Sequence, residues 1–236
     1  MMEKYNYRKD PHQDIDHVFR DLLPAHGMVE RPAQVELSHQ MLDTMLNGSI
    51  ALCDAGTGIG KTYAYLVAGV VFRRYRSRAG LPNQPLLIST SSIALQGAII
   101  HDYLPFLSKV MMADGMLDSP LRAVLRKGKS HYVCDARLMK RLQTANLDRK
   151  NPLAKAALLS MRDHLDLDMA PHLSGYDRER ICVPPTCDCG KTECRYLCYL
   201  DVCVSERYAI QVCNHNLLLA DAIHRGSGKR PILPDS

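Results

Sequence analysis

The sequence has 236 residues, of which 46% are hydrophobic, and its formal net charge is +5 at pH 7. These values predict one or two folded domains and exclude a largely disordered chain. The longest apolar run, residues 63–72, is too short to cross a bilayer, and residues 1–9 are polar with no apolar segment behind them. We therefore expect a cytoplasmic protein with no membrane partner, whose mild positive charge is compatible with a nucleic acid partner.

The first half of the chain alternates expected helices and strands. A helix is expected from Pro32 to about residue 45, because proline is tolerated in a first helical turn and Asn47-Gly48 ends the pattern. Apolar runs at residues 50–53 and 85–90 predict buried strands. A helix is expected after each strand, over about residues 61–76 and 93–107. The alternation is typical of an α/β fold with a parallel sheet.

A glycine-rich segment joins the first expected strand to its helix. It reads Ala55-Gly56-Thr57-Gly58-Ile59-Gly60-Lys61-Thr62 and matches the phosphate-binding loop, except that Ala55 replaces the first glycine. Glycines let the backbone N–H groups converge on phosphate oxygens at the positive end of a helix. Lys61 is expected to reach the β- and γ-phosphates, and the Thr62 hydroxyl to ligate Mg²⁺. The segment predicts binding of a nucleoside triphosphate with Mg²⁺.

The alternation of strands and helices stops after residue 110. A short strand is expected at residues 121–125, followed by a basic turn, Arg126–Ser130, and by helices at 135–144 and 152–165. Strand character returns at residues 208–213, before a short helix at 216–223. We therefore expect a sheet domain over residues 1–115, an inserted domain over 116–204, and a return to the sheet domain over 205–236.

Six of the nine cysteines lie between Cys182 and Cys203. Thiols in a reducing compartment need a reason other than disulfides, and four thiolates at irregular spacing can hold Zn²⁺ or an iron–sulfur cluster. The spacing alone favours neither metal. Cys53 and Cys213 differ from the others, because each lies in an apolar expected strand and is expected to pack there.

Several segments, in order along nearly the whole chain, resemble the N-terminal part of DinG-type helicases, the bacterial relatives of the XPD helicases in superfamily 2. They are Glu30–Gln34, Asp54–Thr62, Ile88–Thr90 with Leu95-Gln96, Lys127–Cys134 and Val212–Asp221. The resemblance implies an ATP-dependent DNA helicase of 5′→3′ polarity. It implies a partial RecA-like sheet interrupted by a mostly helical domain with a [4Fe–4S] cluster. The cluster ligands that it implies are Cys134, Cys182, Cys187 and Cys194, with Cys189 as an alternative to Cys187.

The resemblance also assigns roles to polar residues. It places Arg31 and Gln34 in the nucleotide site, where the glutamine amide reads the adenine edge. Thr90 and Gln96 resemble the motif that contacts the backbone of single-stranded DNA. Residues 122–150 contain nine Lys or Arg and two Asp, which either bind DNA or form a solvated basic face. The DNA-binding candidates there are Arg126, Lys127, Lys129 and Tyr132, the last as a base-stacking ring.

The resemblance further implies an Asp-Glu-Ala-His box after residues 214–221, whose carboxylates hold Mg²⁺ and orient the attacking water. The printed sequence contains no such box. We therefore expect a fragment that binds nucleotide and DNA, and that a further segment or a second chain completes as a motor. The alternative is a non-catalytic, metal-dependent nucleic-acid-binding protein that retains a phosphate-binding loop.

Overall fold

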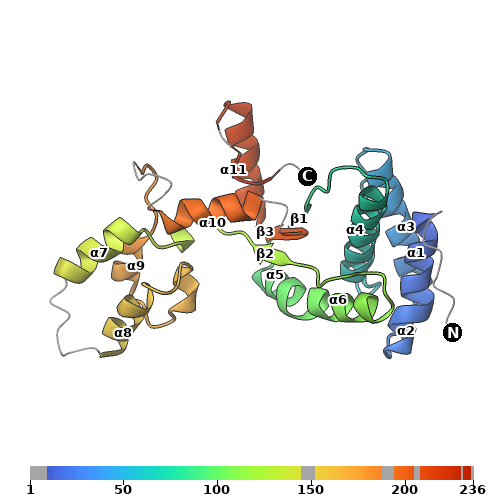
Figure 1. The fold of residues 1–236 in the computed structure, drawn as a ribbon, viewed down its shortest axis with the longest axis horizontal. Helices are drawn as coiled ribbons and strands as arrows, with labels where there is room; N and C mark the ends of the chain where they lie inside the picture. The colour runs from blue at the N-terminus through green and yellow to red at the C-terminus, as the bar shows by residue number, and fades with distance from the viewer. Residues whose placement is uncertain (1–9, 145–151, 188–193, 205–207, 230, 235–236) are drawn as a thin grey trace. The chain divides into compact units, whose positions relative to one another are not determined.

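The computed structural model describes residues 10–144, 152–187, 194–204, 208–229 and 231–234 (Figure 1). The chain divides into two compact units. The first contains Met1–Leu125 and Tyr208–Val212, and the second contains Arg126–Arg207 and Cys213–Pro234. Within the described ranges, no helix has the length and apolar character needed to cross a membrane.

Helices form one side of the first unit. Helix α1 (Pro11–His17) continues into η1 (Val18–Leu22) and α2 (Leu23–Ala25). Helices α3 (Pro32–Leu46) and α4 (Lys61–Arg78) pack against each other, as Figure 1 shows. The apolar side chains between these helices form the core, which includes Ile15, Phe19, Leu42, Leu66, Val67 and Val71. Burial of this apolar surface is what holds the helices together.

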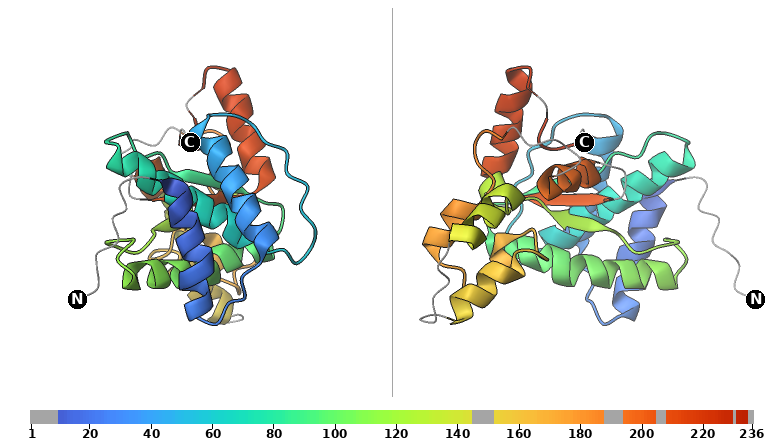
Figure 2. Two further views of the ribbon diagram at one scale, coloured as in Figure 1. Left: turned by 90° about the vertical axis from the view of Figure 1, so that its right-hand side faces the viewer. Right: turned by 60° about the vertical axis from the view of Figure 1, so that its left-hand side comes forward.

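The first unit also contains a three-stranded sheet in the order β1-β3-β2. Its strands are β1 (Leu86–Ser89), β2 (Ala123–Leu125) and β3 (Ile210–Cys213). Strands β2 and β3 pair in parallel, with Ala123 opposite Ile210, and lie side by side in the right-hand view of Figure 2. Every residue of β3 is buried, as expected for the central strand. The parallel pairing confirms the α/β class and is consistent with part of a RecA-like fold.

Strands β1 and β2 are connected by one continuous helical segment. It consists of α5 (Ile93–Ala98), the π-helical turn η2 (Ile99–Tyr103) and α6 (Leu104–Ala113). Ser92 caps the start of α5 by accepting a hydrogen bond from the Leu95 N–H. The prediction of a helix over 93–107 is confirmed, although the helix extends six residues further, to Ala113.

The expected strand at residues 50–53 is absent. This segment has no strand hydrogen bonding, and Ile50 and Leu52 are almost completely exposed. The prediction that Cys53 packs in the sheet was also wrong, because this thiol is exposed, whereas Cys213 is buried in β3 as expected. A strand requires a neighbour for its backbone groups. The sheet formed by β1, β3 and β2 supplies none to residues 50–53.

The second unit is mostly helical. Its elements are η3 (Lys129–His131), α7 (Asp135–Thr144), α8 (Pro152–Ser160), η4 (Leu167–Met169), α9 (Gly175–Ile181), α10 (Arg195–Val204) and α11 (His215–Gly226). Two isolated antiparallel bridges, Tyr132 with Asp166 and Val133 with Cys182, join its chain segments. A buried cluster that includes Val133, Leu138, Leu158, Met161 and Ile181 forms its core.

Candidate functional site

The glycine-rich loop has a backbone that only glycine adopts easily. Gly58 and Gly60 have φ angles of +84° and +90°, in the left-handed region. A Cβ atom on Gly60 would also collide with the side-chain amide of Gln34. Helix α4 begins directly after Gly60, and no side chain caps its first N–H groups. Those N–H groups are therefore available to an anion.

The start of helix α3 holds this loop. The Arg31 guanidinium donates a hydrogen bond of 2.5 Å to the Gly58 carbonyl, and the Gln34 amide donates one of 2.6 Å to the Gly60 carbonyl. Gln34 is 4% exposed. Pro32 occupies the first turn of α3, as the sequence predicts. The two residues that the resemblance places in the nucleotide site therefore contact the loop directly.

Lys61 and Thr62 lie at the start of α4. The Lys61 ammonium is exposed and donates to the loop carbonyls of Ala55 and Gly56 at 2.8 and 3.0 Å. An ammonium has three donors, so a phosphate oxygen can be added or exchanged for a carbonyl. Thr62 lines the adjoining pocket. The loop thus presents the cation and hydroxyl that a nucleotide phosphate with Mg²⁺ requires.

A pocket of about 420 Å³ lies beside the loop and falls in the size range of small-ligand sites. It is lined by Gly27, Met28, Val29, Arg31, Gln34, Gly60, Thr62, Tyr63 and Tyr103. The sequence motifs did not indicate Gly27, Met28, Val29, Tyr63 or Tyr103 as residues of the site. The position of Tyr63 directly after Thr62 was a usable signal, whereas no pattern connects Tyr103 to the loop. None of these lining residues carries a carboxylate.

Thr90 directly follows β1, and Gln96 lies in the first turns of α5. The Gln96 amide donates to the Thr90 carbonyl at 2.8 Å, and the Thr90 hydroxyl accepts from the Ser92 N–H at 3.2 Å. Gln96 is buried rather than on a solvated helix face. The pair therefore fixes the shape of the turn between β1 and α5, and its contact with DNA remains a prediction.

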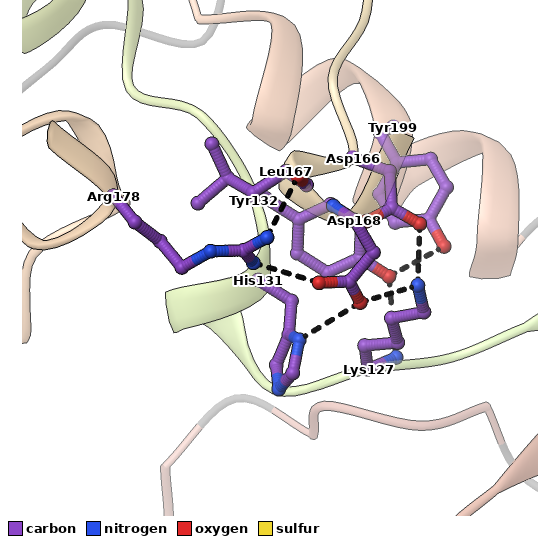
Figure 3. A network of polar contacts seen from close by, with 8 residues as sticks. All are labelled: Lys127, His131, Tyr132, Asp166, Leu167, Asp168, Arg178 and Tyr199. Atoms are coloured by element: carbon purple, nitrogen blue, oxygen red, sulfur yellow. Dashed lines mark hydrogen bonds and ion pairs between the residues drawn. The ribbon is translucent and has the colours of Figure 1, made fainter. Parts of the chain in front are cut away.

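Within the basic turn of the second unit, Lys127 is paired with carboxylates from a distant segment (Figure 3). The Lys127 ammonium lies 2.6 Å from Asp166 and 2.8 Å from Asp168. Asp168 also accepts hydrogen bonds from Arg178, at 2.7 Å, and from His131, at 3.1 Å. Partial burial opposes the charge on both partners. The hydrogen bonds and opposite charges of these groups outweigh the effect of burial. The pKa of Lys127 is therefore raised, and the pKa of Asp168 lies well below its usual value.

The other three DNA-binding candidates of this turn also make contacts within the second unit. Arg126 is 2% exposed and donates to the Ile232 carbonyl at 2.7 Å. Tyr132 is buried, and its hydroxyl accepts from the Lys127 N–H at 3.2 Å. Lys129 is exposed, with its ammonium 2.7 Å from the Pro185 carbonyl. Among the three cationic candidates, Arg126, Lys127 and Lys129, the charge of Lys129 is the most accessible.

Three of the four predicted cluster ligands lie at helix ends. Cys134 precedes α7, Cys182 follows α9, and Cys194 precedes α10. The Cys134 N–H donates to the Ile181 carbonyl at 2.7 Å, next to Cys182, and Val133 forms its bridge with Cys182 itself. The backbone therefore brings Cys134 and Cys182 into neighbouring positions.

An ion pair brings the segments of Cys134 and Cys194 together. The Arg195 guanidinium contacts the Asp135 carboxylate at 2.5 Å, and the rings of Tyr132 and Tyr196 lie 5.3 Å apart. Cys187 is described and exposed, whereas Cys189 lies outside the described residues. In the part of the chain that the structure describes, no group of three or more His, Cys, Asp or Glu side chains is arranged to hold a metal ion.

The glycine-rich loop leads directly into helix α4, as a phosphate-binding loop does, although the strand that precedes such loops is absent at residues 50–53. No family model matches the chain. The chain is 30% identical over 139 residues to the 3'-5' exonuclease DinG of Bacillus subtilis, a match that covers 59% of this chain and 13% of that protein. It is 26% identical over 228 residues to the ATP-dependent DNA helicase YoaA of Haemophilus influenzae, covering 89% of this chain and 32% of that protein.

A third relative is the ATP-dependent helicase DinG of Mycobacterium tuberculosis, 29% identical over 128 residues, which are 54% of this chain and 18% of that protein. The resemblance to DinG-type helicases is therefore confirmed by sequence similarity. The chain spans less than a third of the length of these relatives.

Proposed function

We propose that this chain is part of an ATP-dependent DNA helicase of the DinG type and binds ATP with Mg²⁺ in the pocket beside the glycine-rich loop. The main support is the pair of hydrogen bonds from Arg31 and Gln34 to the carbonyls of Gly58 and Gly60. These bonds bring a guanidinium and an amide to a loop that leads into the N-terminus of α4, which no side chain caps. The names of the relatives support ATP and DNA as the ligands.

Each residue of the site has a defined part in this proposal. The N–H groups of residues 56–62 and the Lys61 ammonium hold the phosphates, and the Thr62 hydroxyl ligates Mg²⁺. The Gln34 amide uses one of its two N–H donors on Gly60, which leaves a donor and an acceptor for the adenine edge. Because the pocket lining has no carboxylate to orient water, we expect binding with negligible turnover by this chain alone.

Calorimetric titration of ATP with Mg²⁺ and a phosphate-release assay test this proposal. Lys61→Ala should weaken ATP binding about tenfold or more, because a hydrogen bond to a charged group contributes about 1.5–3 kcal/mol. Lys109→Ala, an exposed lysine on α6, is the control and should bind ATP normally. Equal ATP binding by both variants contradicts the proposal, and turnover of about one per second that Lys61→Ala abolishes contradicts the expected inactivity.

For the second unit, we propose a [4Fe–4S] cluster on Cys134, Cys182, Cys187 and Cys194, within an inserted domain. The support is the donor set of four thiols and the contacts that join the segments of Cys134, Cys182 and Cys194. When bound, the cluster would cross-link these segments. Around it, the Asp135–Arg195 ion pair and the Val133–Cys182 bridge hold the helix ends in place.

Iron and zinc analysis of anaerobically purified protein tests the cluster. We expect about four iron atoms per chain, following from the cluster type, and their loss in Cys134→Ser. Cys53→Ser is the control, since Cys53 lies in the other unit, and it should retain the iron. One zinc and no iron would overturn the proposal.

We also propose single-stranded DNA as the substrate, with 5′→3′ movement once the motor is completed by a further segment or a second chain. Lys129 and Thr90 offer the more accessible groups among the residues that the resemblance assigns to DNA. Contact by Tyr132 or Arg126 would require a rearrangement, because both are buried. The second candidate function, a metal-dependent nucleic-acid-binding protein without catalysis, would be favoured by DNA binding in the absence of any ATP binding.

A further inference from the structure

Two tyrosines in the nucleotide pocket have no role in the motifs that define the loop. Tyr63 follows Thr62 on α4, and Tyr103 ends the π-helical turn η2. Their ring centroids are 5.2 Å apart, and the ring planes meet at 86°. An edge-to-face pair uses only one face of one ring, so other faces remain for further contacts. Both rings are half-buried and line the pocket with Gln34 and Thr62.

The position of Tyr103 depends on an irregular helix. Residues 99–103 form a π-turn between α5 and α6, and π-turns are often found at functional sites. On the other side of the pair, the Tyr63 ring is supported by Phe106, at 6.2 Å and 68°. The two tyrosines are therefore held by two different helices and by a third aromatic ring.

We infer that Tyr63 and Tyr103 form an aromatic wall on which the nucleotide base stacks, so that they are base-positioning residues of the site. The inference rests on the proposed function. Within the pocket, Gly60 and Thr62 lie at the phosphate end, and Gln34 supplies an amide for the edge of the base. Besides Gly27 and Arg31, the remaining lining consists of the flat or apolar side chains of Met28, Val29, Tyr63 and Tyr103, which suit a purine ring.

Stacking predicts that the base, and not only the triphosphate, contributes to affinity. Base–aromatic stacking changes affinity by about five- to 150-fold per ring when the ring is removed. ATP should therefore bind at least about tenfold more tightly than tripolyphosphate. Tyr103→Leu should remove most of that difference and leave tripolyphosphate binding unchanged. Tyr75→Leu, a more exposed tyrosine on α4 outside the pocket, is the matched control and should change neither.

A second variant keeps the test decisive if Tyr103→Leu does not fold. The chain contains no tryptophan, so Tyr103→Trp introduces a single indole while retaining a stacking ring. We expect ATP to quench its emission and tripolyphosphate to leave it unchanged. Equal effects of the two ligands, or none, would overturn the stacking wall.

The outcomes also separate this inference from the proposed function. If the unchanged protein binds ATP no more tightly than tripolyphosphate, the loop holds phosphate and the aromatic wall is wrong. If Tyr103→Leu loses both ligands equally while remaining folded, the ring supports the loop and does not position the base. If the unchanged protein binds neither ligand, the proposed function fails and the inference fails with it.

Discussion

The glycine-rich loop and the basic turn of the second unit both carry the charges expected of an anion-binding segment, but they use them differently. In the loop, the Lys61 ammonium is exposed, and its hydrogen-bond partners among the described residues are the neutral carbonyls of Ala55 and Gly56. In the turn, the Lys127 ammonium is held between two carboxylates, Asp166 and Asp168. A cation whose partners are neutral can accept a phosphate, whereas one that is already paired must first give up its carboxylates.

The comparison shows that a count of charges over a stretch of sequence does not give the charge available to a ligand. The carboxylates that neutralise Lys127 lie 39 and 41 residues further along the chain. Arg141 is paired in the same way with Asp177, at 2.6 Å. The basic turn therefore helps to fold the second unit, whatever it contributes to DNA.

Replacing Lys127 should give the largest effect. Lys127→Met leaves Asp166 and Asp168 close together without their shared cation, which should lower the free energy of unfolding of the second unit by about 1–3 kcal/mol. The matched control is Lys129→Met, which removes one contact with the Pro185 carbonyl and should cost less than about 1 kcal/mol.

Denaturant unfolding and single-strand binding, measured on both variants, check this prediction. Lys129→Met should weaken DNA binding and reduce its salt dependence by about 0.7 of a log unit per lost phosphate contact. If Lys127→Met instead keeps full stability and loses DNA binding, then the comparison between turn and loop is wrong.

Gly60→Ala tests the loop side of the comparison. A non-glycine residue in the left-handed region costs about 1–2 kcal/mol, and the added methyl group collides with the Gln34 amide. We expect ATP affinity to fall more than tenfold, as calorimetry would show. Gly80→Ala is the control, because Gly80 lies outside the pocket and also has a positive φ, while a Cβ there meets nothing within 4 Å. Equal losses in the two variants would contradict a specific role for the Gln34–Gly60 contact.

Acid should weaken the second unit through Asp168. Hydrogen bonds from Lys127 and Arg178 outweigh burial and hold the pKa of this carboxyl well below its value in the unfolded chain. Its stabilisation is therefore present above about pH 4 and is lost as the pH falls below that value. Because the carboxyl is partly exposed, we expect about 1 kcal/mol.

Melting curves of the unchanged protein and Asp168→Asn between pH 7 and pH 3 measure this contribution. The difference between the two proteins should shrink as the pH falls. A difference that stays constant over this range would show that the Asp168 charge contributes nothing.

Local patterns predicted much of this structure, and contacts between distant residues account for what they missed. The loop geometry follows from eight consecutive residues, and the helix over Asp135–Thr144 agrees with the sequence at both ends. Residues 50–53 have a strand's composition, but strand formation depends on a neighbour that composition does not report. Tyr103 reaches the pocket through the path of η2, and nothing in its local sequence indicates this.

Hydrogen exchange of the unchanged protein with and without ATP and Mg²⁺ tests the central claim, that the loop and not the basic turn receives the nucleotide. The account predicts slower exchange at residues 27–34 and 56–63 when ATP is present, and no change at residues 126–134. Protection confined to residues 126–134, or no protection at the loop at saturating ATP, would contradict it.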